Sequence, residues 1–283
     1  MRRILIFILL AVTATASARN HSKVGKSLER HDSLIAYWDF GTKERSLKAK
    51  GCVEELVLRA QSEDVKPEFV DEGKARSLYF DGGDYLYIPY KQTGSLNVRS
   101  NAVTVVARVK WTRGKIGFVA GMWDEYANGG MRQYGLFISL PHYNGKNQVC
   151  GHISRTGRPT PPFPYSIDYS ASAQEVPDGE WCTVAFTYDG KYIRSYFNGE
   201  FEAREPELIH HTKGFEGYPE GLVQSKNPYY FPDGIGDNGS DFTVGAVFVK
   251  GKIGNHFRGN ISWLAIYDRA LTDSEISQLS GIQ

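Results

Sequence analysis

The stretch that decides the fold lies near the end of the chain and reads FRGNISWLAIYDRALTDSEI, residues 257–276. Its middle part, residues 261–268, is rich in bulky apolar and aromatic residues, which favour extended strands. A similar short run, AYWDF, stands near the start at residues 36–40. Between the two lie LYFDGGDYL at 78–86, GEWCTVAFTYDG at 179–190 and YFNGE at 196–200. These segments indicate a chain built mainly from β-strands.

Strand-like runs rich in Val, Ile, Phe and Tyr recur along the chain and are bounded by Gly, Asp, Asn and Pro. The expected strands cover residues 34–40, 77–80, 85–89, 102–111, 116–123, 134–140, 148–154, 181–188, 192–197, 242–248 and 261–268. Their spacing predicts an all-β, two-sheet antiparallel sandwich. Asn198-Gly199 predicts a tight hairpin, because both residues tolerate positive φ. Only residues 273–279 suggest a helical turn, with Thr272 and Glu275 forming a capping box.

Taken in order, these segments resemble the laminin-G-like (concanavalin-A-like lectin/glucanase) jelly rolls of secreted bacterial proteins. The resemblance covers roughly residues 33–280, and we expect one laminin-G-like jelly-roll domain over residues 33–283. It implies that Trp38 and Trp263 lie in terminal strands that pair with each other. The fold hosts lectins, adhesion modules, glycosidases and polysaccharide lyases alike, so the resemblance does not decide the activity.

The first residues have the composition of a leader. Arg2 and Arg3 precede an apolar run at residues 4–12, and Ala16-Ser17-Ala18 offers a small-residue cleavage site. This pattern predicts a signal peptide over residues 1–18, followed by a polar linker over 19–32. We therefore expect a secreted or periplasmic protein. No later segment is long and apolar enough to span a membrane.

Composition limits the partners and the redox chemistry. The net charge of +1 gives no general attraction for nucleic acid. Three cysteines, Cys52, Cys150 and Cys182, leave at least one thiol unpaired within the chain. Cys150 and Cys182 both fall in expected strands, where they form either a disulfide or two buried apolar side chains.

A candidate ligand surface follows from the strand at residues 148–154. Val149 and Ile153 alternate with Gln148 and His152, so the first pair is expected in the core and the second on an exposed, ligand-facing surface. Arg155, at the strand end, could bind a carboxylate or sulfate through two hydrogen bonds. The alternative is a polar strand face without a ligand.

Two long connections, residues 156–178 and 209–240, are rich in aromatic residues and are expected to wall this surface as a groove. Long loops fixed on a rigid sandwich are where ligand contacts are expected. The expected ligand-binding residues are Gln148, His152, Arg155, Tyr165, Tyr169, Arg194, Tyr229 and Tyr230.

The favoured function is recognition of a polysaccharide or other glycan. One alternative is a lyase that abstracts a proton from a uronate-containing glycan, with His152, Tyr196 and Arg155 as the catalytic candidates. No lyase motif matches residue by residue. A second alternative is a protein-binding adhesion module. Glycosidases need two suitably spaced carboxylates, and the nearest candidates, Asp124-Glu125 and Glu205-Pro206-Glu207, fall in expected loops.

The resemblance also implies a structural calcium ion between the terminal strands. The position where these domains usually carry an Asp is Ser262, a poor calcium ligand. Asp39 and Asp81 remain as candidate ligands, so we expect a weak calcium site. A second oxygen-rich segment contains Asp233, Asp237, Asn238 and Asp241, and a solvated turn is the simpler interpretation of it.

Overall fold

The computed structural model describes residues 32–51, 54–72, 75–210 and 221–281. The predicted signal peptide, nearly all of the predicted linker and Cys52 lie outside the described residues. In the described part of the chain, no helix is both long and apolar enough to cross a membrane.

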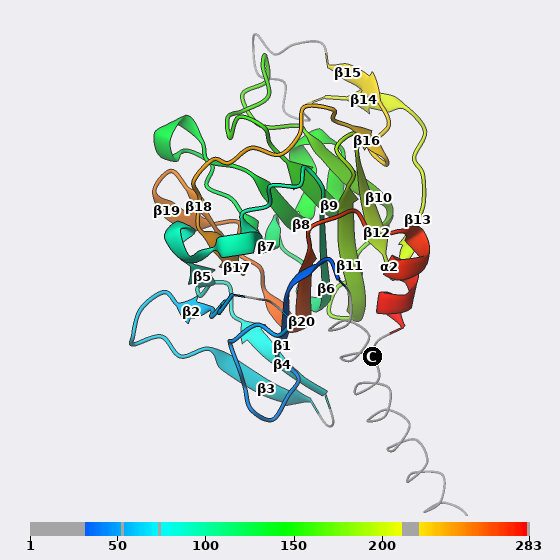
Figure 1. The fold of residues 1–283 in the computed structure, drawn as a ribbon. Helices are drawn as coiled ribbons and strands as arrows, with labels where there is room; N and C mark the ends of the chain where they lie inside the picture. Colours follow the sequence, from blue (N-terminus) through cyan, green and yellow to red (C-terminus); the bar gives the residue numbers. More distant parts are fainter. Residues whose placement is uncertain (1–31, 52–53, 73–74, 211–220, 282–283) are drawn as a thin grey trace, which may run out of the picture.

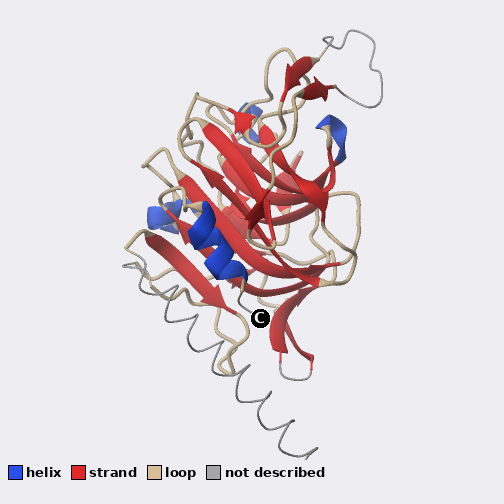
Figure 2. Ribbon diagram, turned by 90° about the vertical axis from the view of Figure 1, so that its right-hand side faces the viewer, coloured by secondary structure: helices blue, strands red, loops and turns tan. Residues whose placement is uncertain are grey.

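Two large antiparallel sheets form a sandwich, as Figures 1 and 2 show, which confirms the predicted fold class. The nine-stranded sheet has the order β13 (Glu200–Phe201), β12 (Tyr192–Phe197), β11 (Trp181–Tyr188), β6 (Val103–Trp111), β20 (Gly259–Tyr267), β4 (Ala75–Phe80), β3 (Glu68–Glu72), with β1 (Leu34–Asp39) beside β20 and β16 (Tyr229–Tyr230) beside β12. The seven-stranded sheet has the order β10 (Tyr169–Glu175), β9 (Gly145–Ile153), β8 (Tyr134–Leu140), β7 (Gly117–Met122), β17 (Phe242–Val244), β5 (Leu86–Ile88), β2 (Arg59–Ala60).

Short elements complete the domain. Two small hairpins pair β14 (Glu207–Ile209) with β15 (Leu222–Gln224) and β18 (Val247–Val249) with β19 (Lys252–Gly254). Single 3₁₀ turns form η1 (Tyr90–Gln92), η2 (Gly94–Leu96), η3 (Ala127–Gly129) and η4 (Pro141–Tyr143), and α2 (Asp273–Ser280) follows the last strand.

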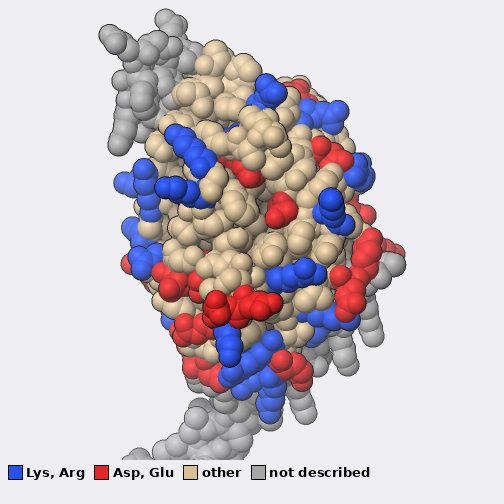
Figure 3. Space-filling model, turned by 90° about the vertical axis from the view of Figure 1, so that its left-hand side faces the viewer, with Lys and Arg blue, Asp and Glu red and all other residues tan. Residues whose placement is uncertain are grey.

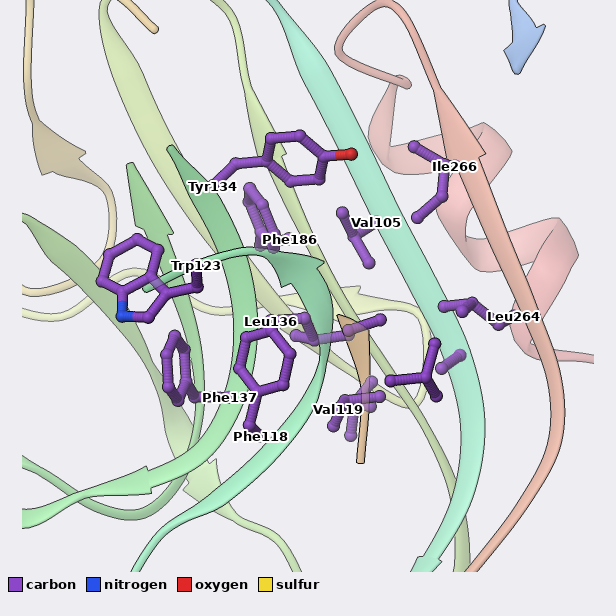
Figure 4. Close-up of a cluster of buried hydrophobic side chains, with 14 of the residues drawn as sticks. Val105, Phe118, Val119, Trp123, Tyr134, Leu136, Phe137, Phe186, Leu264 and Ile266 are labelled. Atoms are coloured by element: carbon purple, nitrogen blue, oxygen red, sulfur yellow. The ribbon is translucent and has the colours of Figure 1, made fainter. Parts of the chain in front are cut away.

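The two ends of the domain are paired, as predicted. Strand β1 runs antiparallel to β20, with Trp38 opposite Leu264 and Asp39 opposite Trp263. Trp38 is fully buried, and its ring stacks on Phe242 of the other sheet at a centroid distance of 5.5 Å. The main core includes the side chains between the two sheets and continues into an aromatic layer on the outer side of the seven-stranded sheet, and Figure 4 shows members of both.

The alternation predicted for residues 148–154 is confirmed. A Cβ placed on Gly151 would lie 2.3 Å from Cβ of Phe186 in the opposite sheet, so position 151 faces the space between the sheets. Val149 and Ile153 share that side of β9, and Cys150 and His152 point to the outer side. Cys150 and Cys182 are both buried free thiols, so they form no disulfide with each other, and the alternative of two buried side chains holds.

Most expected strands appear within a few residues of their predicted bounds, and two differences matter. The run 242–248 divides into β17 and β18 at Gly245, which has a φ of 92°. Strand β10 lies inside the connection that was expected to be a loop. Its sequence, YSASAQE, lacks the β-branched residues that favour strands, and pairing with β9 overrides that weak propensity.

Helix α2 covers the outer face of the nine-stranded sheet (Figure 2). Ile276 and Leu279 are buried there, and the Tyr196 hydroxyl donates a hydrogen bond to Asp273 Oδ1 at 2.8 Å. The predicted capping box is present: Glu275 N donates to Thr272 Oγ1, and Thr272 N donates to the Glu275 carboxylate.

Replacing Thr272 with alanine should lower the free energy of unfolding by about 1 kcal/mol, because the N-cap acceptor is lost. Urea unfolding curves of the two proteins measure the difference. The same replacement at Ser274, inside the helix, serves as the control and should have a smaller effect. Equal effects at the two positions would contradict a specific role for the cap.

Candidate functional site

A cavity of about 410 Å³ lies against the outer side of the seven-stranded sheet. We call it the histidine pocket because His142, His152 and His256 all line it. Its other lining residues are Lys115, Ile116, Trp123, Glu125, Arg132, Phe137, Leu140, Tyr143, Tyr165, Ser166, Tyr169 and Asn255. They come from β8, β9 and β10, from the ends of these strands and from distant connections.

His152 is only 4% exposed, so the prediction of an exposed side chain is wrong. The ring packs against Trp123, Tyr169 and Phe137 at centroid distances of 4.4, 5.2 and 6.1 Å. The outer side of the sheet is therefore a second aromatic layer and not an open surface. Gly135 lies opposite His152 in the neighbouring strand, and a Cβ there would lie 2.8 Å from the Phe137 ring.

Burial lowers the pKa of His152 to about 3, and the positive charges of Lys226 and Arg132 act in the same direction. The imidazole is therefore neutral at ordinary pH and offers one donor and one acceptor. Its Nδ1 atom, like Nδ1 of His256, has no hydrogen-bond partner among the described residues. Buried polar atoms are usually paired, so these two nitrogens fit a site that a polar ligand completes.

Arg132 and Glu125 bring opposite charges to the same pocket. Arg132 Nη1 donates to the Gly157 carbonyl at 2.9 Å, and Glu125 Oε1 accepts from Asn255 Nδ2 at 2.9 Å. Burial raises the pKa of the Glu125 carboxyl, because burial favours its neutral form. The Trp123 indole N–H lies near this carboxylate but outside hydrogen-bond geometry.

The rim is formed by His142 and Tyr165, whose rings lie 5.7 Å apart. His142 belongs to η4, and Tyr169 holds this turn in place. The Tyr169 hydroxyl accepts from Tyr143 N at 3.1 Å and lies 2.6 Å from the Tyr143 carbonyl. Tyr169 was expected to stack on a sugar, and the structure shows instead a buried side chain that supports the pocket.

A second hollow, of about 550 Å³, lies between the two long connections. We call it the loop groove. It is lined by Arg155, Phe163, Asp168, Tyr229, Tyr230 and their neighbours. Arg155 donates to the Ile235 carbonyl at 2.9 Å, and Tyr230 is 46% exposed. Tyr229 is buried, with its hydroxyl 3.2 Å from Asp168 Oδ1.

The structure separates the other predicted site residues. Gln148 accepts a hydrogen bond from Arg204 at 3.0 Å and lines neither hollow. Arg194 forms an ion pair with Asp189 at 2.7 Å in the nine-stranded sheet. Tyr196 lies under α2 on the outer face of that sheet, on the opposite side of the sandwich from His152. The catalytic trio of His152, Tyr196 and Arg155 is therefore wrong, because its members do not share a site.

The expected calcium ligands are also apart. Asp39 lies opposite Trp263, whereas Asp81 follows Phe80, which lies opposite Gly259, so the register separates them by more than about 13 Å along β20. Asp39 accepts from Gly41 N, and Asp81 accepts from Gly83 N. No cluster of three or more His, Cys, Asp or Glu side chains suited to a metal ion occurs among the described residues.

Three side chains of the oxygen-rich segment at residues 233–241 form hydrogen bonds within the protein. Asp237 accepts hydrogen bonds from the Tyr90 hydroxyl at 2.7 Å and from Asn97 Nδ2 at 2.8 Å. Asp241 accepts from Tyr90 N at 2.8 Å, and Asn238 donates to the Arg132 carbonyl. These side chains hold the connection against η1 and η2.

Sequence reasoning missed Trp123, Arg132 and His256 as pocket residues. Trp123 ends an expected strand and is followed directly by two carboxylates, and this was the signal available in the sequence. Arg132 and His256 stand in connections whose positions depend on pairings between distant segments. On the face shown in Figure 3, positive and negative side chains are interspersed, in keeping with the small net charge.

Comparison with protein-family models and with curated protein sequences found no match. Solved structures are similar to the chain at low identity. One is domain 4 of AbnA, a GH43 extracellular arabinanase from Geobacillus stearothermophilus, in complex with arabinotriose (17% identity, 88% of this chain and 98% of that chain, TM-score 0.53).

Another is the botulinum neurotoxin serotype D binding domain (12% identity, 91% of this chain, TM-score 0.51). This chain spans 53% of the toxin domain's length. At such identities the likeness concerns the fold alone. The chain therefore has the concanavalin-A-like β-sandwich fold that its sequence resembles.

Proposed function

We propose that the protein binds a carbohydrate in the histidine pocket. The observation that carries this proposal is the convergence of aromatic rings and partly unsatisfied polar groups on one cavity. The cavity volume of about 410 Å³ lies in the range of small-ligand sites, which are mostly apolar with a few placed polar groups. Trp123, Tyr165 and the histidines supply flat apolar surface, and Glu125 and Arg132 supply an acceptor and donors.

A sugar matches this lining because it presents both C–H faces and hydroxyl groups. The C–H faces can stack on aromatic rings, and each hydroxyl both donates and accepts hydrogen bonds. The neutral His152 imidazole and the Glu125 carboxylate are suitable acceptors. The arabinanase domain that shares this fold was solved with arabinotriose, so the fold can hold an oligosaccharide.

Binding is tested by a glycan array followed by titration calorimetry with the best ligand. Tyr165→Ala should weaken binding about tenfold, or about 1.4 kcal/mol, because Tyr165 lines the pocket at its rim. Tyr230→Ala, which removes an exposed ring from the loop groove, is the control and should leave the affinity unchanged. The opposite result would place the ligand in the loop groove and contradict the proposal.

The glycan that binds best also distinguishes a binding protein from a lyase, when it is incubated with the protein and its ultraviolet absorbance is followed. A polysaccharide lyase generates an unsaturated product that absorbs in the ultraviolet, and a binding protein leaves the glycan intact. If wild-type protein binds no glycan in the array, carbohydrate recognition is excluded for the glycans tested and a protein-binding role becomes the better hypothesis.

A further inference from the structure

We propose that the histidine pocket selects a sugar that carries a carboxylate, and that Arg132 binds this carboxylate. This inference rests on the proposed carbohydrate binding and goes further, because it names the chemical class of the ligand. Its starting point is an arginine side chain that is buried beside a cavity and makes no direct ion pair with the described residues.

Arg132 is only 2% exposed and lines the pocket. The guanidinium has five N–H donors. Only Nη1 donates a hydrogen bond to a described residue, and its acceptor is the Gly157 carbonyl. No carboxylate of the described residues lies within 4.0 Å of its guanidinium. Glu125 and Asp124 act on this guanidinium only at longer range, and the centroid of the Tyr126 ring lies 5.6 Å from its central carbon. A buried cation without a direct ion pair is costly, and an anion bound to its free donors would offset that cost.

Other arginines in the domain already have partners. Arg204 makes an ion pair with Glu207 at 2.5 Å, and Arg269 makes one with Glu275 at 2.6 Å. Arg155, the residue that sequence reasoning chose for a carboxylate, is exposed and lines the loop groove. Of these four arginines, Arg132 is the one that lines the histidine pocket and still has free N–H donors.

The backbone holds the Arg132 guanidinium in a fixed place. Gly130 has a φ of 118°, and a Cβ there would lie 2.7 Å from Arg132 Nη1 and 2.1 Å from the Gly157 carbonyl oxygen. The two glycines therefore let the guanidinium reach that carbonyl. A fixed, planar guanidinium is suited to a planar carboxylate, to which it can donate two parallel hydrogen bonds.

The other charged side chains of the pocket are Lys115 and Glu125, and together with Arg132 they suit a ligand that carries a single carboxylate. Lys115, which is exposed, adds a second positive charge. Glu125 is the opposing charge, and its Oε1 atom is already bonded to Asn255 Nδ2. Its other oxygen can accept from a sugar hydroxyl. Arg132 and Glu125 would then bind different parts of one acidic sugar, the carboxylate and a hydroxyl group.

The test compares matched uronate oligosaccharides, each in its free acid form and as its methyl ester, by titration calorimetry against the full mature protein. Wild type should bind at least one acid at least tenfold more tightly than its ester. Arg132→Lys keeps the charge but not the paired donors, and should reduce this preference. Arg132→Gln should abolish it, whereas Arg158→Gln, at an exposed position in the loop groove, should retain it.

Thermal melting of each variant shows whether it is folded. If Arg132→Gln does not fold, the acid-to-ester ratio of the wild type and of Arg132→Lys still decides the matter. Equal affinity for acid and ester would overturn the inference and leave carbohydrate binding intact. Preference for sulfated over carboxylated sugars would also overturn it. Failure to bind any glycan would remove the proposed function together with the inference.

Discussion

Replacement of Trp38 with alanine should lower the free energy of unfolding by about 3–5 kcal/mol, the usual cost of removing a large aromatic side chain from a core. Trp38 is fully buried, stacks on Phe242 across the two sheets, and donates its indole N–H to the Leu47 carbonyl at 3.1 Å. It thus joins β1, the opposite sheet and the connection after β1. Chemical unfolding followed by fluorescence or circular dichroism measures the loss.

Trp181→Ala is the matched control. This tryptophan begins β11, is only partly buried, and has the Arg108 guanidinium 5.7 Å from its ring centroid. Its removal should cost about 1 kcal/mol, because the site can fill with water and leaves a smaller cavity. A loss of only about 1 kcal/mol for Trp38→Ala, no larger than that expected for Trp181→Ala, would show that β1 is not an integral part of the core.

The sequence predicts the framework of this domain well, because the framework depends on local patterns. The alternation along β9, the Asn198-Gly199 turn and the capping box at Thr272 each need only a few neighbouring residues, and the structure confirms all three. The pairing of β1 with β20 is a long-range contact. It was accessible only through the resemblance to known jelly rolls.

The candidate site was harder to predict, because alternation tells which side of a sheet a residue faces and not what covers that side. His152 does point away from the space between the sheets. Trp123, Phe137 and Tyr169, which come from three other segments, cover it. Tyr196 also points outward, but its strand belongs to the other sheet. No local pattern distinguishes two outward faces on opposite sides of a sandwich.

Burial of His152 has a measurable consequence at acidic pH. The pKa of His152 is about 3 in the folded protein and near its ordinary value of 6.5 in the unfolded chain, mainly because burial disfavours the charged form. Between these values the unfolded chain binds a proton that the folded protein does not bind. The contribution of His152 to stability is therefore complete above pH 6.5 and falls as the pH is lowered towards 3, by about 1.4 kcal/mol per pH unit.

His152→Gln removes the titrating group, so between about pH 6 and pH 4 the variant should lose about 2.5 kcal/mol less free energy of unfolding than the wild type. Urea unfolding at a series of pH values measures both slopes. Burial raises the pKa of Glu125 and of Asp168, which act in the opposite sense, but both proteins contain them and their effect cancels in the difference. If His152→Gln keeps the wild-type slope, burial does not lower the pKa of His152 in the folded protein, and the prediction is wrong.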